Sequence, residues 1–421
     1  MPLIIHLDNQ QRWYSGGETI SGHVEFQCAQ ATEVDDIRVS FFGRSKAKVQ
    51  KVKGSAAPSA SYRSKCVLFD KERILSHLNG DTLSPGTYEW PFVFTFPSNV
   101  QSPGQSSGWT EKSPFRNDVN HPLPPSFAVD TGDTLRKLNC AIEYQLEAEV
   151  FKSQRGFLGK KLALFKETLH LRFVPPAPSA EKACDSVIYR QQRAEMFEIR
   201  SILLLLENRG RSLTFQERLQ SWVSARQPRF SFKATFSYPI RVKQGSSLTC
   251  LLEIHPFMED SSVSLPPEIS LQSLSLCVVS QTAARAAPSL IGSLSGQVHE
   301  RIELLNQRSL AMPVMGTLDL SHTLGPLRLS RSDISFSTFN LSRSYLLCAS
   351  FAFECAGKSV EFSLADMPFE MVADVQATSG SKDIAENSAQ GAPPSYHASN
   401  SSTEDGKKNR ERLNERSVGW F

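Results

Sequence analysis

Two short stretches of the chain carry residue types that perform catalysis in other proteins. The first, Gly104-Gln-Ser106-Ser-Gly108, has the Gly-x-Ser-x-Gly spacing of the hydrolase nucleophile elbow. That elbow needs a strand before the serine and a helix after it, so that the hydroxyl is exposed on a sharp turn. Here proline, serine and glycine surround the string, and Trp109-Thr-Glu-Lys-Ser-Pro114 follows it. These surroundings favour a loop, and we interpret the spacing as a chance match.

The second stretch is His23-Val-Glu25, which lacks the downstream cysteine pair that a zinc deaminase requires. On an alternating strand, His23 and Glu25 would simply share one polar face. The sequence contains no phosphate-binding glycine loop and no set of histidines and cysteines at zinc spacing. We therefore expect no catalytic residues, no cofactor and no metal site.

A linear docking motif stands near the C-terminal end, where Pro393-Pro394-Ser395-Tyr396 has the form Pro-Pro-x-Tyr. Consecutive prolines hold a polyproline II conformation before binding, which reduces the entropy lost on binding. WW domains receive this conformation in an aromatic groove, and Tyr396 would fill an adjacent pocket. Pro393, Pro394 and Tyr396 are thus the predicted WW-domain-binding residues. The alternative is an accidental string in a solvated tail.

Four lysines near one strand end form a second candidate contact: Lys46, Lys48, Lys51 and Lys53. Clustered ammonium groups can accept an acidic or phosphorylated segment of a cargo protein. The more common explanation is an edge strand that lysines protect from aggregation. We favour the edge strand and keep the acidic or phosphorylated cargo as the alternative.

Composition sets limits on the class of protein. The chain has 421 residues, which is enough for two domains, and a net charge of +3, which gives no drive toward nucleic acid. No secretory signal is apparent, and the longest strongly apolar run, Ile202 to Leu206, is too short for a membrane segment. Eight scattered cysteines suit reduced thiols in the cytoplasm. In that compartment the glycosylation triplets at Asn340 and Asn400 are chance matches.

Period-two alternation is the main structural signal. Apolar or small residues occupy alternate positions in three stretches: Ile20 to Cys28, Tyr88 to Phe96 and Ile142 to Val150. This pattern predicts strands with one face on a core, and turn residues such as Ser84-Pro85-Gly86 precede them. Because strands and helices do not alternate regularly, we expect an all-β protein of antiparallel sandwiches.

The pattern divides the chain into four segments. These are a first β-sandwich (1–174), a partly helical connector (175–228), a second β-sandwich (229–373) and a disordered tail (374–421). Consecutive prolines in Val174-Pro175-Pro176-Ala177-Pro178 end the last strand before the connector. Two helices are expected in the connector, at Tyr189 to Asn208 and at Phe215 to Ala225. Thr214 and Glu217 form a capping-box pair at the start of the second helix. Within the sandwiches we expect a short helix at 69–78 and loops at 53–64, 98–126 and 281–300. The tail is poor in apolar residues and cannot offset its ordering entropy.

Several blocks along both sandwiches occur in a characteristic order. They are Tyr14-Ser-Gly-Gly-Glu18-Thr-Ile-Ser-Gly22-His-Val24, Leu83-Ser-Pro85-Gly86-Thr-Tyr88-Glu-Trp90-Pro91-Phe92, Leu123-Pro-Pro125-Ser-Phe127 with Ile142-Glu-Tyr144-Gln-Leu146-Glu-Ala148, Val242-Lys-Gln-Gly245-Ser-Ser-Leu-Thr-Cys-Leu, and Phe339-Asn-Leu-Ser-Arg-Ser-Tyr345. In this order they resemble the α-arrestin family, the arrestin-related trafficking adaptors, from about residue 3 to residue 373. Ser246 stands where that family usually has an acidic residue.

The resemblance implies two immunoglobulin-like sandwiches of the arrestin fold, without an active site, and recruitment of HECT-type ubiquitin ligases through Pro-Pro-x-Tyr motifs. It suggests a non-catalytic adaptor that brings a WW-domain ligase to cytosolic segments of membrane transporters or receptors. Such an adaptor promotes ubiquitination and endocytosis, and is recruited from the cytoplasm to the plasma membrane or endosomes. The alternative is an arrestin-fold signalling or sorting scaffold that does not depend on the ligase.

Overall fold

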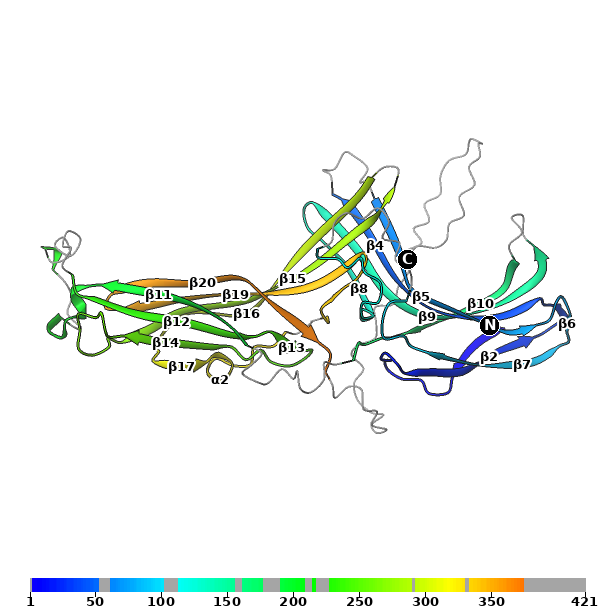
Figure 1. Cartoon of the computed structure of the whole chain (residues 1–421), viewed down its shortest axis with the longest axis horizontal. Helices are drawn as coiled ribbons and strands as arrows, with labels where there is room; N and C mark the ends of the chain where they lie inside the picture. Colours follow the sequence, from blue (N-terminus) through cyan, green and yellow to red (C-terminus); the bar gives the residue numbers. More distant parts are fainter. Residues whose placement is uncertain are drawn as a thin grey trace, which may run out of the picture. The chain divides into compact units, whose positions relative to one another are not determined.

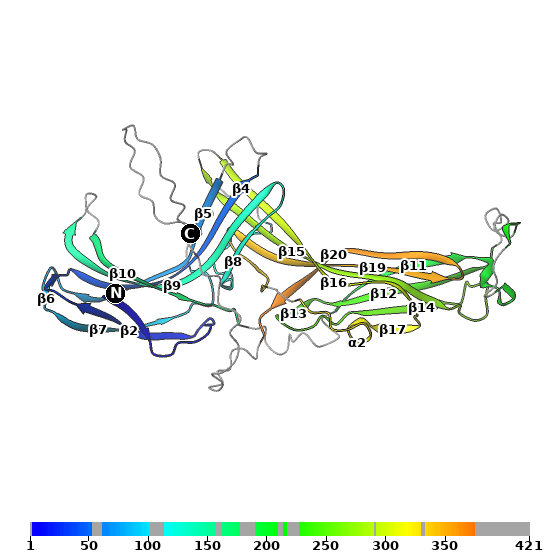
Figure 2. The same ribbon diagram turned by 180° about the vertical axis from the view of Figure 1, so that it is seen from behind.

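The computed structural model describes residues 2–52, 61–101, 113–155, 161–176, 190–208, 214–216, 227–289, 292–329 and 333–374. All of them belong to one compact unit, Met1–Val375, whereas the second unit, Gln376–Phe421, lies outside the described residues. The regular structure is almost entirely β, with mostly antiparallel pairing in two sandwiches (Figures 1 and 2). The all-β prediction is confirmed. The tail predicted from residue 374 onward falls outside the described residues apart from Asp374 itself.

The first sandwich consists of two main sheets and a short ribbon. One sheet has the order β1 (Leu3–Leu7), β2 (Thr19–Cys28), β7 (Gly86–Thr95). The other has the order β10 (Lys161–Leu171), β9 (Arg136–Arg155), β4 (Asp36–Lys51), β5 (Ser61–His77), with β8 (Phe127–Gly132) also paired to β9. The ribbon joins β3 (Thr32–Glu33) and β6 (Thr82–Leu83).

Aromatic side chains fill the core between these sheets. Phe92 and Phe94 of β7 and the following Phe96 are buried, and Phe96 packs edge-on against Phe41 with ring centroids 4.8 Å apart. Gly43 of β4 lies against two further aromatic rings of the core, those of Phe69 and Tyr144. A Cβ at residue 43 would come within 2.8 Å of both. The alternation seen in the sequence therefore places one face of each strand on a common apolar core.

The second sandwich also has two sheets. One has the order β11 (Arg190–Arg200), β12 (Arg229–Pro239), β14 (Leu251–Phe257), β17 (Gly316–Asp319). The other has the order β13 (Arg241–Lys243), β20 (Lys358–Val372), β19 (Leu341–Cys355), β15 (Ile269–Ser289), β16 (Gly292–Pro313), with β18 (Phe336–Ser337) paired to β19. β13 runs parallel to β20, and the short helix α2 (Leu320–Thr323) follows β17.

The helix expected from Tyr189 to Asn208 is wrong over Arg190–Arg200, which form strand β11. Phe197 and Ile199 are buried and alternate with exposed neighbours, so the period is two, and every residue of β11 pairs with β12. The second sandwich therefore includes Arg190–Arg200, which precede residue 229. Among the described residues of the connector, helical structure consists of two 3₁₀ turns, Ile202–Leu204 and Leu206–Asn208, and the pair 215–216. The rest of the helix predicted to Ala225 lies outside the described residues.

Two further local predictions are wrong because the residues concerned pair in β-strands. Residues 69–78 do not form a helix, because β5 continues to His77 in register with β4. The described residues of the loop predicted at 281–300 are instead strand residues, because 281–289 belong to β15 and 292–300 to β16 of one hairpin. Of the loop predicted at 53–64, the described residues 61–64 belong to β5. The described parts of the loop predicted at 98–126 contain no strand and one isolated bridge, between Asn99 and Pro122.

The β15–β16 hairpin links the two sandwiches. Ala284 of β15 and Leu294 and Val298 of β16 belong to the same buried cluster as the core of the first sandwich. Gly296 allows close packing there, since a Cβ at this position would lie 3.0 Å from Leu138 and 3.2 Å from Val49. Figures 1 and 2 both show the hairpin reaching toward β4.

Candidate functional site

The residues predicted to bind a WW domain, Pro393, Pro394 and Tyr396, lie outside the described residues. The same holds for the hydrolase-like string Gly104 to Gly108 and for Lys53. Among the predicted site residues, the structure therefore places Lys46, Lys48 and Lys51.

The edge-strand explanation for these lysines is wrong, because β4 lies between β9 and β5 in the sheet. Lys46 and Lys48 point to the solvent face of the sheet, whereas Ala47 and Val49, which alternate with them, are buried. Lys51, the last residue of β4, is an odd number of residues from Lys46 and Lys48. Its side chain therefore lies on the other face of the sheet. The structure thus brings two of the four lysines together and separates the third.

Strand register adds residues that the sequence reading missed. Lys65 of β5 is the direct partner of Lys46, and Arg63 is the partner of Lys48. With Arg44 of β4 they form a group of five cationic side chains, here called the basic face: Arg44, Lys46, Lys48, Arg63 and Lys65. Because Arg63 and Lys65 are two residues apart, the sequence could have placed them on one face of a strand. Only the pairing of β5 with β4 shows that they lie beside Lys48 and Lys46.

The basic face is electrostatically crowded. Partial burial lowers the pKa of Lys65, and the nearby cations Arg44 and Lys46 lower it further. Glu143 of β9 relieves part of this repulsion through an ion pair of 2.7 Å with Lys46. The Nε atom of Arg44 is buried and has no hydrogen-bond partner within the described part of the chain, while its guanidinium stacks 3.6 Å from the Phe42 ring. Concentrated positive charge of this kind attracts acidic segments.

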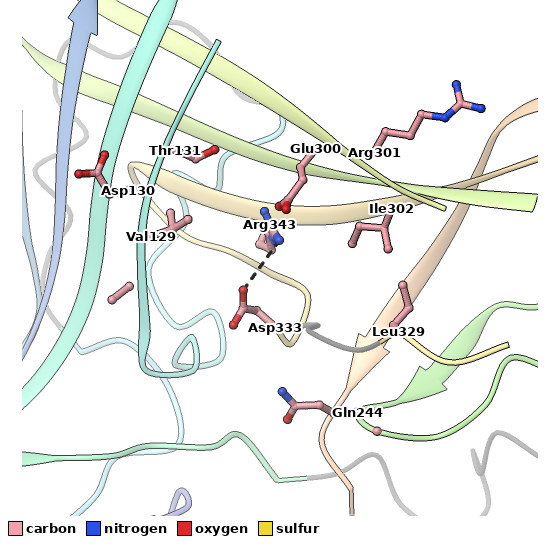
Figure 3. A pocket seen from close by; sticks show the side chains of 12 residues that line it. Val129, Asp130, Thr131, Gln244, Glu300, Arg301, Ile302, Leu329, Asp333 and Arg343 are labelled. Carbon is pink, nitrogen blue, oxygen red and sulfur yellow. Dashed lines mark ion pairs between the residues drawn. The ribbon is translucent and has the colours of Figure 1, made fainter. Parts of the chain in front are cut away.

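A pocket of about 870 Å³ opens between strands of the two sandwiches (Figure 3). Its walls come from β8, β16, β19 and nearby loops: Ala128, Val129, Asp130, Thr131, Gln244, Gly245, Glu300, Arg301, Ile302, Leu329, Asp333 and Arg343. Figure 3 shows Arg343 and Asp333 facing each other, with 3.8 Å between their charged groups. Arg343 is buried and also donates to Thr282, at 2.5 Å. Burial raises the pKa of Asp333, while Arg343 opposes that shift.

A buried polar cluster connects the sandwiches more directly. The side-chain amide of Asn340 donates to the Ser64 hydroxyl at 2.9 Å and to the main-chain carbonyl of Ser45 at 3.3 Å. The Ser64 hydroxyl donates in turn to the carbonyl of Arg285, at 2.8 Å. All four residues are buried, so the glycosylation triplet at Asn340 is inaccessible. We call Ser45, Ser64, Arg285 and Asn340 the junction cluster.

The guanidinium of Arg285 extends this cluster. Its Nε donates to the carbonyl of Phe339 at 2.6 Å, and Nη2 donates to the side-chain oxygen of Asn117. The same guanidinium lies 4.6 Å from the centre of the Phe115 ring. A planar cation held by two hydrogen bonds and a ring has little freedom to move.

His121 forms a second polar bridge. Its Nδ1 lies 2.8 Å from the carbonyl of Asp118, and its Nε2 lies 2.9 Å from the Thr338 hydroxyl. Since a carbonyl only accepts, Nδ1 carries the proton and Nε2 of the neutral ring accepts from Thr338. Burial lowers the pKa of His121, which keeps the ring neutral. The ring also packs edge-on against Phe339 with centroids 5.0 Å apart. These bonds position the two sandwiches against each other.

No helix in the described part of the chain combines the length and apolar character that a membrane span requires. A comparison with curated proteins found no match.

A comparison with family models matched residues 3–107 to the model described as Arrestin (or S-antigen), N-terminal domain. The matched region runs from β1 through β7, and thus covers one complete sheet of the first sandwich and two long strands of the other. Arrestins are non-enzymatic adaptors, so the match supports a general role in trafficking or signalling. Together with the all-β sandwich fold, the match shows that residues 3–107 are similar to the arrestin N-terminal domain.

Proposed function

We propose that the chain is a non-catalytic adaptor that recruits a HECT-type ubiquitin ligase through Pro393, Pro394 and Tyr396. The observation that carries this proposal is the presence, in one chain, of an arrestin N-terminal domain match and a Pro-Pro-x-Tyr sequence. The adaptor joins the ligase to the cytosolic segments of membrane transporters or receptors, and thereby promotes their ubiquitination and endocytosis. It acts from the cytoplasm at the plasma membrane or endosomes.

Bridging requires two contacts, neither of which needs high affinity. Once the tail motif holds the ligase and the sandwiches hold the cargo, the two partners experience a raised effective concentration. The basic face is our candidate for the cargo contact, because its cations line one exposed side of β4 and β5. An acidic or phosphorylated segment would make charge-assisted hydrogen bonds there.

The ligase contact is tested with the full chain and a panel of isolated WW domains. Tyr396→Ala removes an aromatic anchor and should weaken binding by on the order of 2 kcal/mol, or about 30-fold in Kd. Ser395→Ala changes the variable position of the motif and serves as the matched control, with nearly unchanged binding expected. Equal binding by the intact and Tyr396→Ala chains would leave the ligase-independent signalling or sorting scaffold as the better explanation.

The cargo contact is tested separately by anisotropy with an acidic phosphoserine peptide and its unphosphorylated form. The double variant Lys48→Glu/Arg63→Glu should weaken binding of the phosphorylated peptide about tenfold or more. Lys358→Glu, an exposed lysine on β20, is the control for loss of positive charge alone. If both variants lose the same affinity, the basic face is not the cargo site, and the ligase contact is unaffected by that result.

A further inference from the structure

Three side chains that can bind metal meet on the first sandwich, on the sheet formed by β1, β2 and β7. His6 lies on β1, and His23 and Glu25 lie on β2. His23 and Glu25 share one face of β2 because they are two residues apart, as the sequence indicated. The antiparallel register then places His6 directly opposite His23.

The geometry of the three groups is close to a ligand set. The His6 and His23 rings stack with centroids 4.8 Å apart, and His6 Nε2 lies 2.8 Å from Glu25 Oε2. One candidate ligand atom from each residue can be chosen so that all three lie within 4.8 Å of one another. All three side chains are partly exposed, with 42% for His6 and 17% for Glu25, so an ion can approach from solvent.

Neighbouring residues hold this group in place. Gly22 allows β1 to approach β2 closely at this point, since a Cβ at residue 22 would lie 2.0 Å from the His6 carbonyl oxygen. Gln27 donates to Glu25 Oε1 at 2.8 Å, which leaves Oε2 directed at His6. A second carboxylate oxygen held by an outer hydrogen bond is a common feature of metal-ligating carboxylates.

We propose that His6, His23 and Glu25 bind a divalent transition metal ion of the zinc type, with water completing the coordination. Two imidazoles and one carboxylate suit zinc, whose bonds to nitrogen and oxygen are about 2.0–2.2 Å long. Ligand atoms in a tetrahedral site then lie about 3.4 Å apart, by simple geometry from those bond lengths. The present atoms lie within 4.8 Å of one another, so binding requires the side chains to close in on the ion, which would take the place of the contact between His6 and Glu25.

The ion would join the short edge strand β1 to β2. β1 has five residues and pairs only with β2 among the described strands. A ligand that binds only the folded state stabilises it by mass action. Metal binding should therefore raise the thermal stability of the chain, in addition to any role of the proposed adaptor.

The test uses the full chain with Co²⁺ as a spectroscopic probe and Zn²⁺ as its competitor. The intact chain should bind one equivalent of Co²⁺ with the visible absorption of a four-coordinate nitrogen and oxygen site, and Zn²⁺ should displace it. His6→Asn, His23→Asn and Glu25→Gln should each weaken Co²⁺ binding at least about tenfold. They should also abolish the rise in the thermal unfolding midpoint with Zn²⁺.

His170→Asn is the matched control, because His170 is an exposed histidine on β10 whose ring contacts Gln145. It should bind Co²⁺ as the intact chain does. The proposal is overturned if the three variants retain full affinity, or if His170→Asn loses as much as they do. A charge-transfer band from thiolate ligands would also overturn it, since that band assigns the metal to cysteines. Circular dichroism spectra of the variants show whether each one is folded.

Discussion

Asn340 and Ser64, 276 residues apart in the chain, form a fully buried side-chain hydrogen bond of 2.9 Å. Asn340 precedes β19 of the second sandwich, and Ser64 belongs to β5 of the first. The bond is therefore part of what fixes one sandwich against the other. Since buried polar groups are expensive to leave unsatisfied, the junction cluster should be sensitive to single substitutions.

Asn340→Ala is expected to destabilise the chain by about 1–3 kcal/mol. It removes the side-chain oxygen that accepts from the Ser45 hydroxyl and the side-chain NH2 that donates to the Ser64 hydroxyl. Chemical unfolding followed by fluorescence measures this change. Asn306→Ala is the control, since the Asn306 side chain is exposed and donates a hydrogen bond to the exposed Glu303. Equal losses in the two variants would contradict a structural role for the cluster.

Arg285→Lys is expected to cost on the order of 2 kcal/mol of stability, although the charge is kept. A lysine ammonium cannot reproduce the planar contact with Phe115 while donating toward both Phe339 and Asn117. Differential scanning calorimetry of the variant should show a lower unfolding midpoint. Arg308→Lys, at an exposed position on β16, should leave the midpoint almost unchanged. An unchanged unfolding midpoint in the Arg285→Lys variant would show that only the positive charge matters at this position.

His121 should make the stability of the chain fall in mild acid. Burial lowers its pKa below the ordinary histidine value of 6.5, so the folded state binds a proton less readily than the unfolded state. The stabilisation is complete above 6.5 and is lost as the pH falls toward the lowered pKa. Protonated Nε2 could no longer accept from Thr338.

The measurement is the free energy of unfolding at about pH 7.5 and about pH 5.5, on either side of the ordinary histidine pKa. His121→Gln should be less stable than the intact chain at the higher pH, and its loss on acidification should be smaller. A variant that shows the same pH dependence as the intact chain would assign the acid sensitivity to other groups.

The cysteines should differ sharply in reactivity toward a thiol reagent. Burial raises the pKa of Cys66, Cys140 and Cys250 to about 12, so their thiolates are scarce in the folded state. Cys348 is the partly exposed cysteine among those described. In a Cys184→Ser background, one thiol should react rapidly, and adding Cys348→Ala should remove that reaction. Continued rapid labelling of the double variant would show that a buried site opens.

Much of the fold was predictable because alternation directly reports which face of a strand is buried. The aromatic run that ends at Phe96 and the alternation from Ile142 to Val150 both lie on the core as expected. The error at Arg190–Arg200 arose because intrinsic preference favours helix in a run rich in glutamine, arginine and glutamate. Pairing with β12 overrides that weak preference, since it satisfies the backbone and buries Phe197 and Ile199.

The candidate sites also fall into those that a local sequence pattern reveals and those that depend on pairing between distant strands. The Pro-Pro-x-Tyr motif was found in the sequence because it is a contiguous string that needs no fold. Lys46 and Lys48 were found as a cluster, but the edge-strand explanation was wrong because sheet order is a property of distant pairings. The expectation of no metal site rested on linear spacing, which does not show that His6 lies beside His23 and Glu25.

The sequence by itself determined the strand faces, the cores they bury, the Pro-Pro-x-Tyr string and the blocks that resemble an arrestin. Each is a local pattern, set by chain geometry over a few residues. Only the tertiary structure decided the place of β4 within its sheet, the junction cluster around Asn340 and the meeting of His6 with His23. These depend on register and contact between segments far apart in the chain, and no local pattern encodes which distant segments will pair.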